Sequence, residues 1–177
     1  MSVVVLAILF YVSLPDRIFH APTSYVVEDR DGNLLGASIA SDGQWRFPSD
    51  RPVPEKFARC IVAFEDKRFF YHPGVDLIAL GRAIVQNIRS RRVVSGGSTL
   101  SMQVIRMSRD QPRTLWQKMV EAFLAIRLEA SHRKSSILAL YSANAPFGSN
   151  VVGLDAAAWR YFGRPPDRLS WAESAML

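Results

Sequence analysis

A proline-punctuated segment, Ser49 to Pro54 (SDRPVP), divides the chain into two parts with different hydrophobic patterns. Before it, short β-prone runs alternate with the pairs Asp31-Gly32 and Asp42-Gly43, a pattern typical of strands joined by hairpin turns. After it, apolar residues recur at helical spacing to the end of the chain. The chain has 177 residues, of which 49% are hydrophobic, and this is enough for a packed domain without disulfide bonds. We therefore expect a mainly α fold preceded by a short β-hairpin region.

Apolar stripes and capping residues place the individual helices. We expect a first helix over 54–64, a second over 77–88 with Asp76 as its N-cap, and a third that begins at Leu100. A long helix over 115–130 follows the capping-box pattern of Thr114 and Gln117. Further N-caps are expected at Ser135-Ser136, at Asp155 and at Ser170, the last with Glu173 in a capping box.

The N-terminal run Val3 to Leu14 is apolar and uncharged, but its dozen residues are fewer than the ~20 that span a bilayer. We interpret residues 1–14 as the outer part of a membrane anchor, although a buried N-terminal core helix is an alternative. Residues 15–52 would then be a β-rich lead-in, and residues 53–177 the main domain. The abrupt start in an apolar run and the abrupt stop inside a helix predict a fragment of a longer protein, so that the main domain is truncated at its C-terminal end.

The net charge of +6 suits a partner with negative charge, such as anionic lipid, a phosphorylated substrate or nucleic acid. Aromatic residues lie on the apolar stripes rather than among the basic residues, so we expect no nucleic acid. The single cysteine, Cys60, excludes a disulfide framework and a cysteine zinc site within this sequence.

Polar side chains that could take part in catalysis or binding are concentrated in Glu65 to Asp76 (EDKRFFYHPGVD). Glu65 stands where an apolar helix gives way to a turn, a position from which a carboxylate can line a cleft and act as a general base. An amphipathic helix end followed by an ordinary turn explains the same residues equally well.

Two further constellations follow. The loop at Gly96 to Thr99 and the helix after it offer backbone N–H groups, hydroxyls, Gln103 and Arg106, which together favour a phosphate group. A flexible linker is the alternative for this loop. The second is Glu121, which lies among apolar residues and needs a basic partner if it is buried; Lys118 or Arg106 can supply it.

Four segments together resemble successive motifs of the family 51 peptidoglycan glycosyltransferases, most like the penicillin-binding protein 1C type. These segments are EDKRFFYHPGVD, GGSTLSMQVIR, QKMVEAFLAIRLE and APFGSNVVGLDAAAWRYFGRPPDRLSWAESAML, and the resemblance runs from about Val53 to Leu177. The resemblance implies a lysozyme-like fold and polymerisation of lipid II into glycan strands. It makes Glu65 the general base toward the acceptor hydroxyl, and Glu121 the group that assists departure of the lipid diphosphate.

The resemblance also implies a set of substrate-binding residues: Asp66, Phe69, His72, Gly74, Ser98, Thr99, Gln103, Arg106 and Lys118. It implies no protein metal ligands, and leaves open a Mg²⁺ or Mn²⁺ ion at the diphosphate. It places the chain in the cytoplasmic (inner) membrane as a single-pass protein with its catalytic domain on the outer, periplasmic face. Its partners would be lipid II, the growing glycan strand, membrane lipid and other cell-wall synthesis proteins.

Several residues depart from the family pattern. Gln117 replaces an arginine, Ser101-Met102 replaces a Thr-Gln pair, Ser136 replaces a glutamate, and Ser142-Ala143 replaces a Leu-Asn pair. The changes at Ser136, Ser142 and Ala143, together with the expected truncation at Leu177, keep open a catalytically inactive fragment that binds lipid II or acts as a scaffold. Lysozyme-like hydrolysis of existing glycan is a third hypothesis, which the basic, hydroxyl-rich middle of the chain disfavours.

Overall fold

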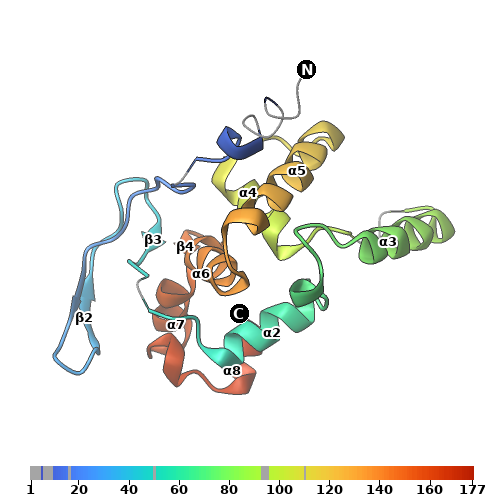
Figure 1. The fold of residues 1–177 in the computed structure, drawn as a ribbon. Helices are drawn as coiled ribbons and strands as arrows, with labels where there is room; N and C mark the ends of the chain where they lie inside the picture. Colours follow the sequence, from blue (N-terminus) through green and yellow to red (C-terminus); the bar gives the residue numbers. More distant parts are fainter. Residues whose placement is uncertain (1–4, 6–9, 16, 50, 93–95, 110) are drawn as a thin grey trace. The chain divides into compact units, whose positions relative to one another are not determined.

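The computed structural model describes residues 5, 10–15, 17–49, 51–92, 96–109 and 111–177 (Figure 1). In chain order its elements are β1 (Val26–Glu28), β2 (Leu34–Ala37), β3 (Trp45–Arg46), α2 (Glu55–Glu65), η1 (Phe69–Tyr71), α3 (Leu77–Ser90), α4 (Leu100–Arg109), α5 (Leu115–Ser131), α6 (Lys134–Asn144), β4 (Val151–Val152), α7 (Leu154–Phe162), η2 (Pro166–Arg168) and α8 (Trp171–Met176). The expectation of a mainly helical chain with a small β region is confirmed.

The chain forms two compact units. Unit 1 comprises residues 1–18 and 65–137, and unit 2 comprises residues 19–64 and 138–177. Glu65, the last residue of α2, belongs to unit 1. The sequence boundaries expected at 14/15 and 52/53 stay predictions.

The first predicted hairpin is present in unit 2. Strands β1 and β2 pair antiparallel, with Val26 opposite Ala37. The Asp29 carboxylate accepts hydrogen bonds from the backbone N–H groups of Asp31 and Asn33, both at 2.8 Å, and so closes the turn at Gly32. The local sequence alone is sufficient for this feature.

The second predicted hairpin is wrong in its pairing. A tight turn does form at Asp42-Gly43, where the Gly43 N–H donates to the carbonyl oxygen of Ala40. However, β3 then pairs in parallel with β4, with Trp45 opposite Val151, and not with β2. A strand of two residues gains its stability from such tertiary pairing and from its core contacts rather than from the adjoining turn.

The core of unit 2 forms around this second pairing. Phe47, Val151, Ala156 and Ala157 are buried together, and residues from β1, β2 and α7 pack against them. The predicted N-cap at Asp155 is wrong: Gly153 is the N-cap of α7, and Asp155 lies in the first turn, where its charge still favours the helix. The predicted capping box is confirmed, since the Glu173 N–H donates to the Ser170 hydroxyl and the Ser170 N–H donates to the Glu173 carboxylate.

Helices α4 and α5 pack against each other in unit 1. Both helices carry fully buried side chains, including Leu100, Val104, Ile105, Ala125 and Leu128. The Thr114 hydroxyl accepts the N–H of Gln117 at 3.1 Å, so the predicted cap of α5 is confirmed. By contrast, Ser135 and Ser136 do not cap α6, because that helix begins one residue earlier, at Lys134.

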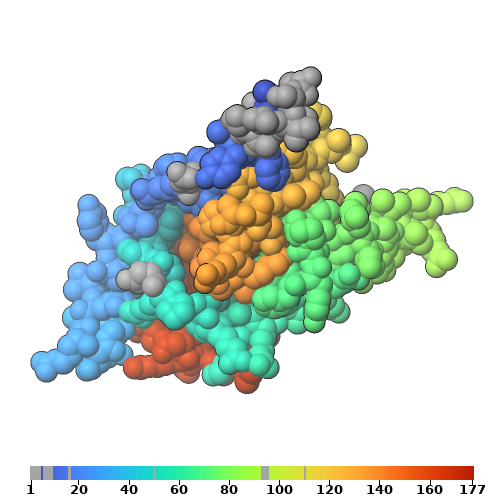
Figure 2. Space-filling view, in the orientation of Figure 1, coloured from blue at the N-terminus to red at the C-terminus, as the bar shows by residue number. Residues whose placement is uncertain are grey.

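Helix α3 begins where expected, because the Asp76 carboxylate accepts the N–H groups of Ile78 and Ala79. Its apolar stripe is not a core face, however. Leu77 is 75% exposed and Ile88 is 71% exposed, and Ala83 is the one described residue of α3 that is buried. Figure 2 shows the visible surface of this helix, in light green, open to solvent.

The predicted anchor at residues 1–14 lies largely outside the described residues. Within the described part, residues 10–12 are helical, and the Arg127 guanidinium of α5 donates to the carbonyl oxygens of Phe10 and Tyr11. Among the described residues we find no helix with the length and apolar character needed to cross a bilayer.

Candidate active site

Glu65 ends α2, and its carboxylate meets a side chain of α4. The Gln103 side-chain amide donates to Glu65 Oε2 at 2.7 Å. Glu65 as a whole residue is half-buried. One oxygen is therefore oriented by a neutral donor, and the residue is not enclosed by the protein.

Glu121 lies on α5, is only 8% exposed, and is paired with Arg106 of α4. The guanidinium Nε donates to both carboxylate oxygens at 3.2 Å, and Nη2 donates to Oε2 at 3.1 Å. Nη2 also donates to the Ser98 hydroxyl at 3.3 Å. Of the two basic partners that the sequence offered to Glu121, Arg106 is therefore the one that binds it.

One face of α4 serves both carboxylates. Gln103 and Arg106 are three residues apart and so neighbour each other on the helix surface. The first binds Glu65 and the second binds Glu121. The structure thus brings together Glu65, Glu121, Ser98, Gln103 and Arg106, all of them predicted site residues.

The loop after Glu65 is held by a buried Asp–His pair. His72 Nε2 lies 3.1 and 3.0 Å from the two carboxylate oxygens of Asp66, and both residues are 6% exposed. The Gly74 N–H donates to His72 Nδ1 at 3.2 Å. Because Nδ1 accepts this bond, the ring hydrogen must be on Nε2, from which it is donated to Asp66. Asp66 also accepts the Leu100 N–H at 3.0 Å and so fixes the start of α4.

Three more predicted site residues are packed inside unit 1. The Thr99 hydroxyl donates to the Gly74 carbonyl oxygen at 2.5 Å and accepts the Met102 N–H, so Thr99 caps α4. Gly74 has a φ of +103°, and a Cβ there would lie 2.7 Å from backbone atoms of Ala125 and Ile126. Phe69 is fully buried. Burial of these three, together with Asp66 and His72, suits residues that position the site rather than touch a ligand.

Lys118 stands apart from this arrangement. It is half-buried on α5, and no hydrogen bond or ion pair joins its side chain to another described residue. Its predicted role at the substrate stays a prediction.

The sequence reasoning missed a second charged pair in unit 1. Glu129 of α5 and Lys134 of α6 are bonded at 2.7 Å, and Glu129 also accepts the Ser101 hydroxyl. A signal was available, because each charge stands at the unfavourable end of its helix.

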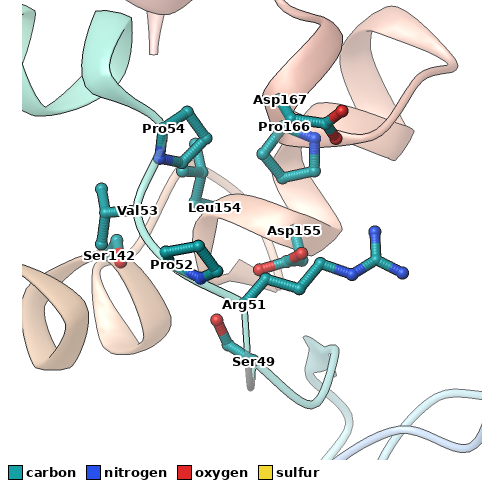
Figure 3. Close-up of a pocket in the computed structure, with 10 residues that line it drawn as sticks. All are labelled: Ser49, Arg51, Pro52, Val53, Pro54, Ser142, Leu154, Asp155, Pro166 and Asp167. Atoms are coloured by element: carbon teal, nitrogen blue, oxygen red, sulfur yellow. The ribbon is translucent and has the colours of Figure 1, made fainter.

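The described residues contain no group of three or more His, Cys, Asp or Glu side chains that could hold a metal ion. The divalent cation at the diphosphate stays a prediction. A pocket of about 240 Å³ is present in unit 2 beside Pro52, Pro54 and Pro166, and Ser142 also lines it (Figure 3). None of the predicted site residues lines this pocket.

Comparison with known proteins finds relatives over most of the chain. The chain is 40% identical to "Penicillin-binding protein 1C" of Escherichia coli (strain K12) over 86% of its length. It is 35% identical to "Penicillin-binding protein 1A" of Aquifex aeolicus (strain VF5) over 99% of its length. It is 32% identical to "Biosynthetic peptidoglycan transglycosylase" of Nitrosomonas eutropha (strain DSM 101675 / C91 / Nm57) over 91% of its length. It spans 20%, 25% and 66% of the lengths of these relatives. A family model described as "Transglycosylase" matches residues 31–177. The chain therefore belongs to the transglycosylase family.

Proposed function

We propose that this chain is the catalytic part of a peptidoglycan glycosyltransferase that polymerises lipid II into glycan strands. The family match and the names of its relatives support this function. The resemblance of the four sequence motifs supports the same substrate.

In the proposed reaction, Glu65 takes the proton from the 4-hydroxyl of the acceptor sugar. The acceptor oxygen then bonds to the anomeric carbon of the donor, and the bond from that carbon to the lipid diphosphate breaks. The pairing of Glu65 with the neutral amide of Gln103 supports this role, because it orients one carboxylate oxygen without engaging it in an ion pair.

Departure of the diphosphate requires positive charge at the leaving group. Arg106 would supply it. Its Nε and Nη2 are engaged by Glu121 and Ser98, and Nη1 makes no hydrogen bond with another described residue. A guanidinium held along one edge can present its free nitrogen to a phosphate oxygen. Glu121 would therefore assist departure by orienting Arg106.

One observation carries this proposal above the others. A single face of α4 binds both candidate carboxylates, one through a neutral donor and the other through a cation. Two carboxylates in different electrostatic surroundings are what a base and a leaving-group assistant require. We extend the proposal to an outer-face location at the cytoplasmic membrane, with the predicted anchor, membrane lipid and cell-wall synthesis proteins as partners.

The substitution Glu65→Gln tests the proposal. It keeps an amide-sized side chain opposite Gln103 but removes the base. The assay follows conversion of lipid II into glycan strands by the purified protein in detergent, with the products resolved by gel electrophoresis. We expect the unaltered protein to form strands and the rate of Glu65→Gln to be at least about 100-fold lower. The matched control is Glu55→Gln at the other end of α2, whose carboxylate is exposed and paired with Arg59.

Full activity of Glu65→Gln would overturn the role of Glu65. Binding of lipid II by the unaltered protein without polymer formation would instead favour the inactive scaffold hypothesis. Release of soluble fragments from purified peptidoglycan would favour hydrolysis.

A further inference from the structure

A partly buried ion pair in unit 1, Lys134 with Glu129, has no role in the chemistry proposed above. Lys134 Nζ donates to Glu129 Oε1 at 2.7 Å and to the carbonyl oxygen of His72 at 2.7 Å. The same ammonium lies 4.4 Å from the centre of the Phe69 ring. The Glu129 side chain is 7% exposed, and its Oε1 also accepts the Ser101 hydroxyl at 2.5 Å.

Local helix stability does not explain these two charges. Lys134 is the first residue of α6, where the helix dipole disfavours a cation. Glu129 lies in the last turn of α5, where the dipole disfavours an anion. Each residue therefore stands at the wrong end of its helix. The compensation comes from tertiary contacts: the pair neutralises itself and binds two other segments.

The two segments bound by the pair are the loop that follows Glu65 and helix α4, which supplies Gln103 and Arg106. Lys134 binds the loop after Glu65 at His72, whose ring donates to Asp66, the neighbour of Glu65. Glu129 binds Ser101 in the first turn of α4, two residues before Gln103. The ion pair thus connects the loop behind the base to the helix that supplies the partner of the base.

We propose that Lys134, held by Glu129, is a positioning residue for Glu65. The inference rests on the proposed glycosyl transfer. Lys134 touches no reacting atom in this scheme; it fixes the Asp66–Gly74 loop against α4 so that Glu65 and Gln103 keep their alignment. Small misplacements of a catalytic group can cost about 100-fold in rate, so such a residue has a measurable effect on turnover.

The first measurement is the kinetics of lipid II polymerisation for Lys134→Met, which keeps the length of the side chain but removes the charge. We expect kcat to fall about 10- to 100-fold while KM stays within about threefold, because the variant misplaces the base without altering groups that bind substrate. Lys134→Arg restores a cation and should recover part of kcat. Arg133→Met is the control, since it removes an exposed cation one residue earlier.

The second measurement needs no activity. Hydrogen exchange reports the Leu100 N–H, which donates to Asp66, and the Gly74 N–H, which donates to His72. In Lys134→Met both amides should exchange at least about tenfold faster than in the unaltered protein, while Arg133→Met leaves them unchanged.

The two measurements separate the two proposals. If the unaltered protein does not polymerise lipid II, the proposed function fails. The exchange rates then still test whether Lys134 holds the Asp66–Gly74 loop against α4. If the unaltered protein is active but Lys134→Met has unchanged kcat per folded molecule, the positioning role is overturned. Unchanged exchange at Leu100 and Gly74 overturns it as well.

Discussion

The pairing of Arg106 with Glu121 leads to a quantitative prediction about stability. The substitution Arg106→Met removes four hydrogen bonds, three to Glu121 and one to Ser98. It leaves a carboxylate that is 8% exposed without its cation. Removal of one partner from a buried pair is costly because the remaining charge stays desolvated.

The magnitude follows from the geometry. Two unit charges about 4 Å apart attract each other by about 4 kcal/mol at an effective dielectric constant of about 20. Solvent weakens this attraction, since 31% of the Arg106 side chain is exposed. We therefore expect Arg106→Met to lower the free energy of unfolding of unit 1 by about 2–3 kcal/mol.

The added substitution Glu121→Gln should reverse much of this loss. The double variant Arg106→Met/Glu121→Gln no longer buries an unpaired charge, so we expect it to recover about 1–2 kcal/mol relative to Arg106→Met. Arg109→Met is the control on the same helix. Arg109 is exposed and makes one long bond to Gln117, so its loss should cost less than about 0.5 kcal/mol.

The assay must report unit 1 alone, because a chain with two compact units need not unfold in one step. Hydrogen exchange of α4 and α5 amides in increasing urea meets this condition. The reasoning is refuted if Arg106→Met and Arg109→Met lose the same stability. It is also refuted if Glu121→Gln restores nothing in the Arg106→Met background.

Two further predictions concern the loop after Glu65. Gly74→Ala should lower the free energy of unfolding by at least about 2 kcal/mol, because the added Cβ would meet α5 backbone and because φ at Gly74 is positive. Thermal unfolding measures this loss, with Gly36→Ala as the control, since a Cβ at Gly36 has open space. Asp76→Ala should cost about 0.5–2 kcal/mol at pH 7 by loss of the α3 cap, whereas Asp76→Asn should cost less. Burial by itself would raise the pKa of Asp76, but the Ala79 and Ile78 N–H groups and the Arg68 guanidinium together hold that pKa below its usual value. The contribution of the charge is therefore complete above about pH 4 and is lost as pH falls through the lower folded pKa. The difference in stability between Asp76→Ala and the unaltered protein, measured by urea titration, should therefore narrow in acid.

Helices could be predicted from the sequence because their signals are local. Apolar stripes at helical spacing and side-chain caps such as Asp76, Thr114 and Ser170 lie within a few residues of the elements that they define. The predicted cap of α7 is wrong because local signals alone do not distinguish two candidate positions. Gly153 and Asp155 both fit the start of a helix, and the choice depends on a tertiary contact, since a Cβ at Gly153 would lie 2.7 Å from the Ala143 carbonyl oxygen.

The pairing of β3 with β4 could not be predicted from local pattern. Trp45 and Val151 are more than 100 residues apart in sequence, and each strand has only two residues. So short a run carries no periodicity. For α3 the local pattern is clear, and the helix was predicted from it. However, an amphipathic pattern does not show whether other elements cover the apolar face, and in α3 that face is exposed.

In the candidate site, too, residue types could be predicted from the sequence but their partners could not. The residue types at Glu65, Gln103, Arg106 and Glu121 were predicted, and the structure shows which of them bind one another. Tertiary contacts decided that Arg106 and not Lys118 is the partner of Glu121. They also decided that Asp66, His72 and Thr99 lie inside unit 1, because their polar groups are satisfied by backbone and by each other.

Helix α4 supplies a binding partner to each of the two candidate carboxylates. Gln103 and Arg106 lie about 4.5 Å apart along the helix axis, as any residues three positions apart must. Gln103 binds Glu65 and Arg106 binds Glu121, so the two partners arise less than one helical turn apart. What remains adjustable is where α4 begins. Thr99 caps its first turn and Asp66 accepts its Leu100 N–H, so the loop after Glu65 sets the register of the helix that orients Glu65. Glu65 and Gln103 are therefore positioned by a closed set of contacts. If Glu65 is the base, as proposed, a change at any member should alter turnover before it alters substrate affinity.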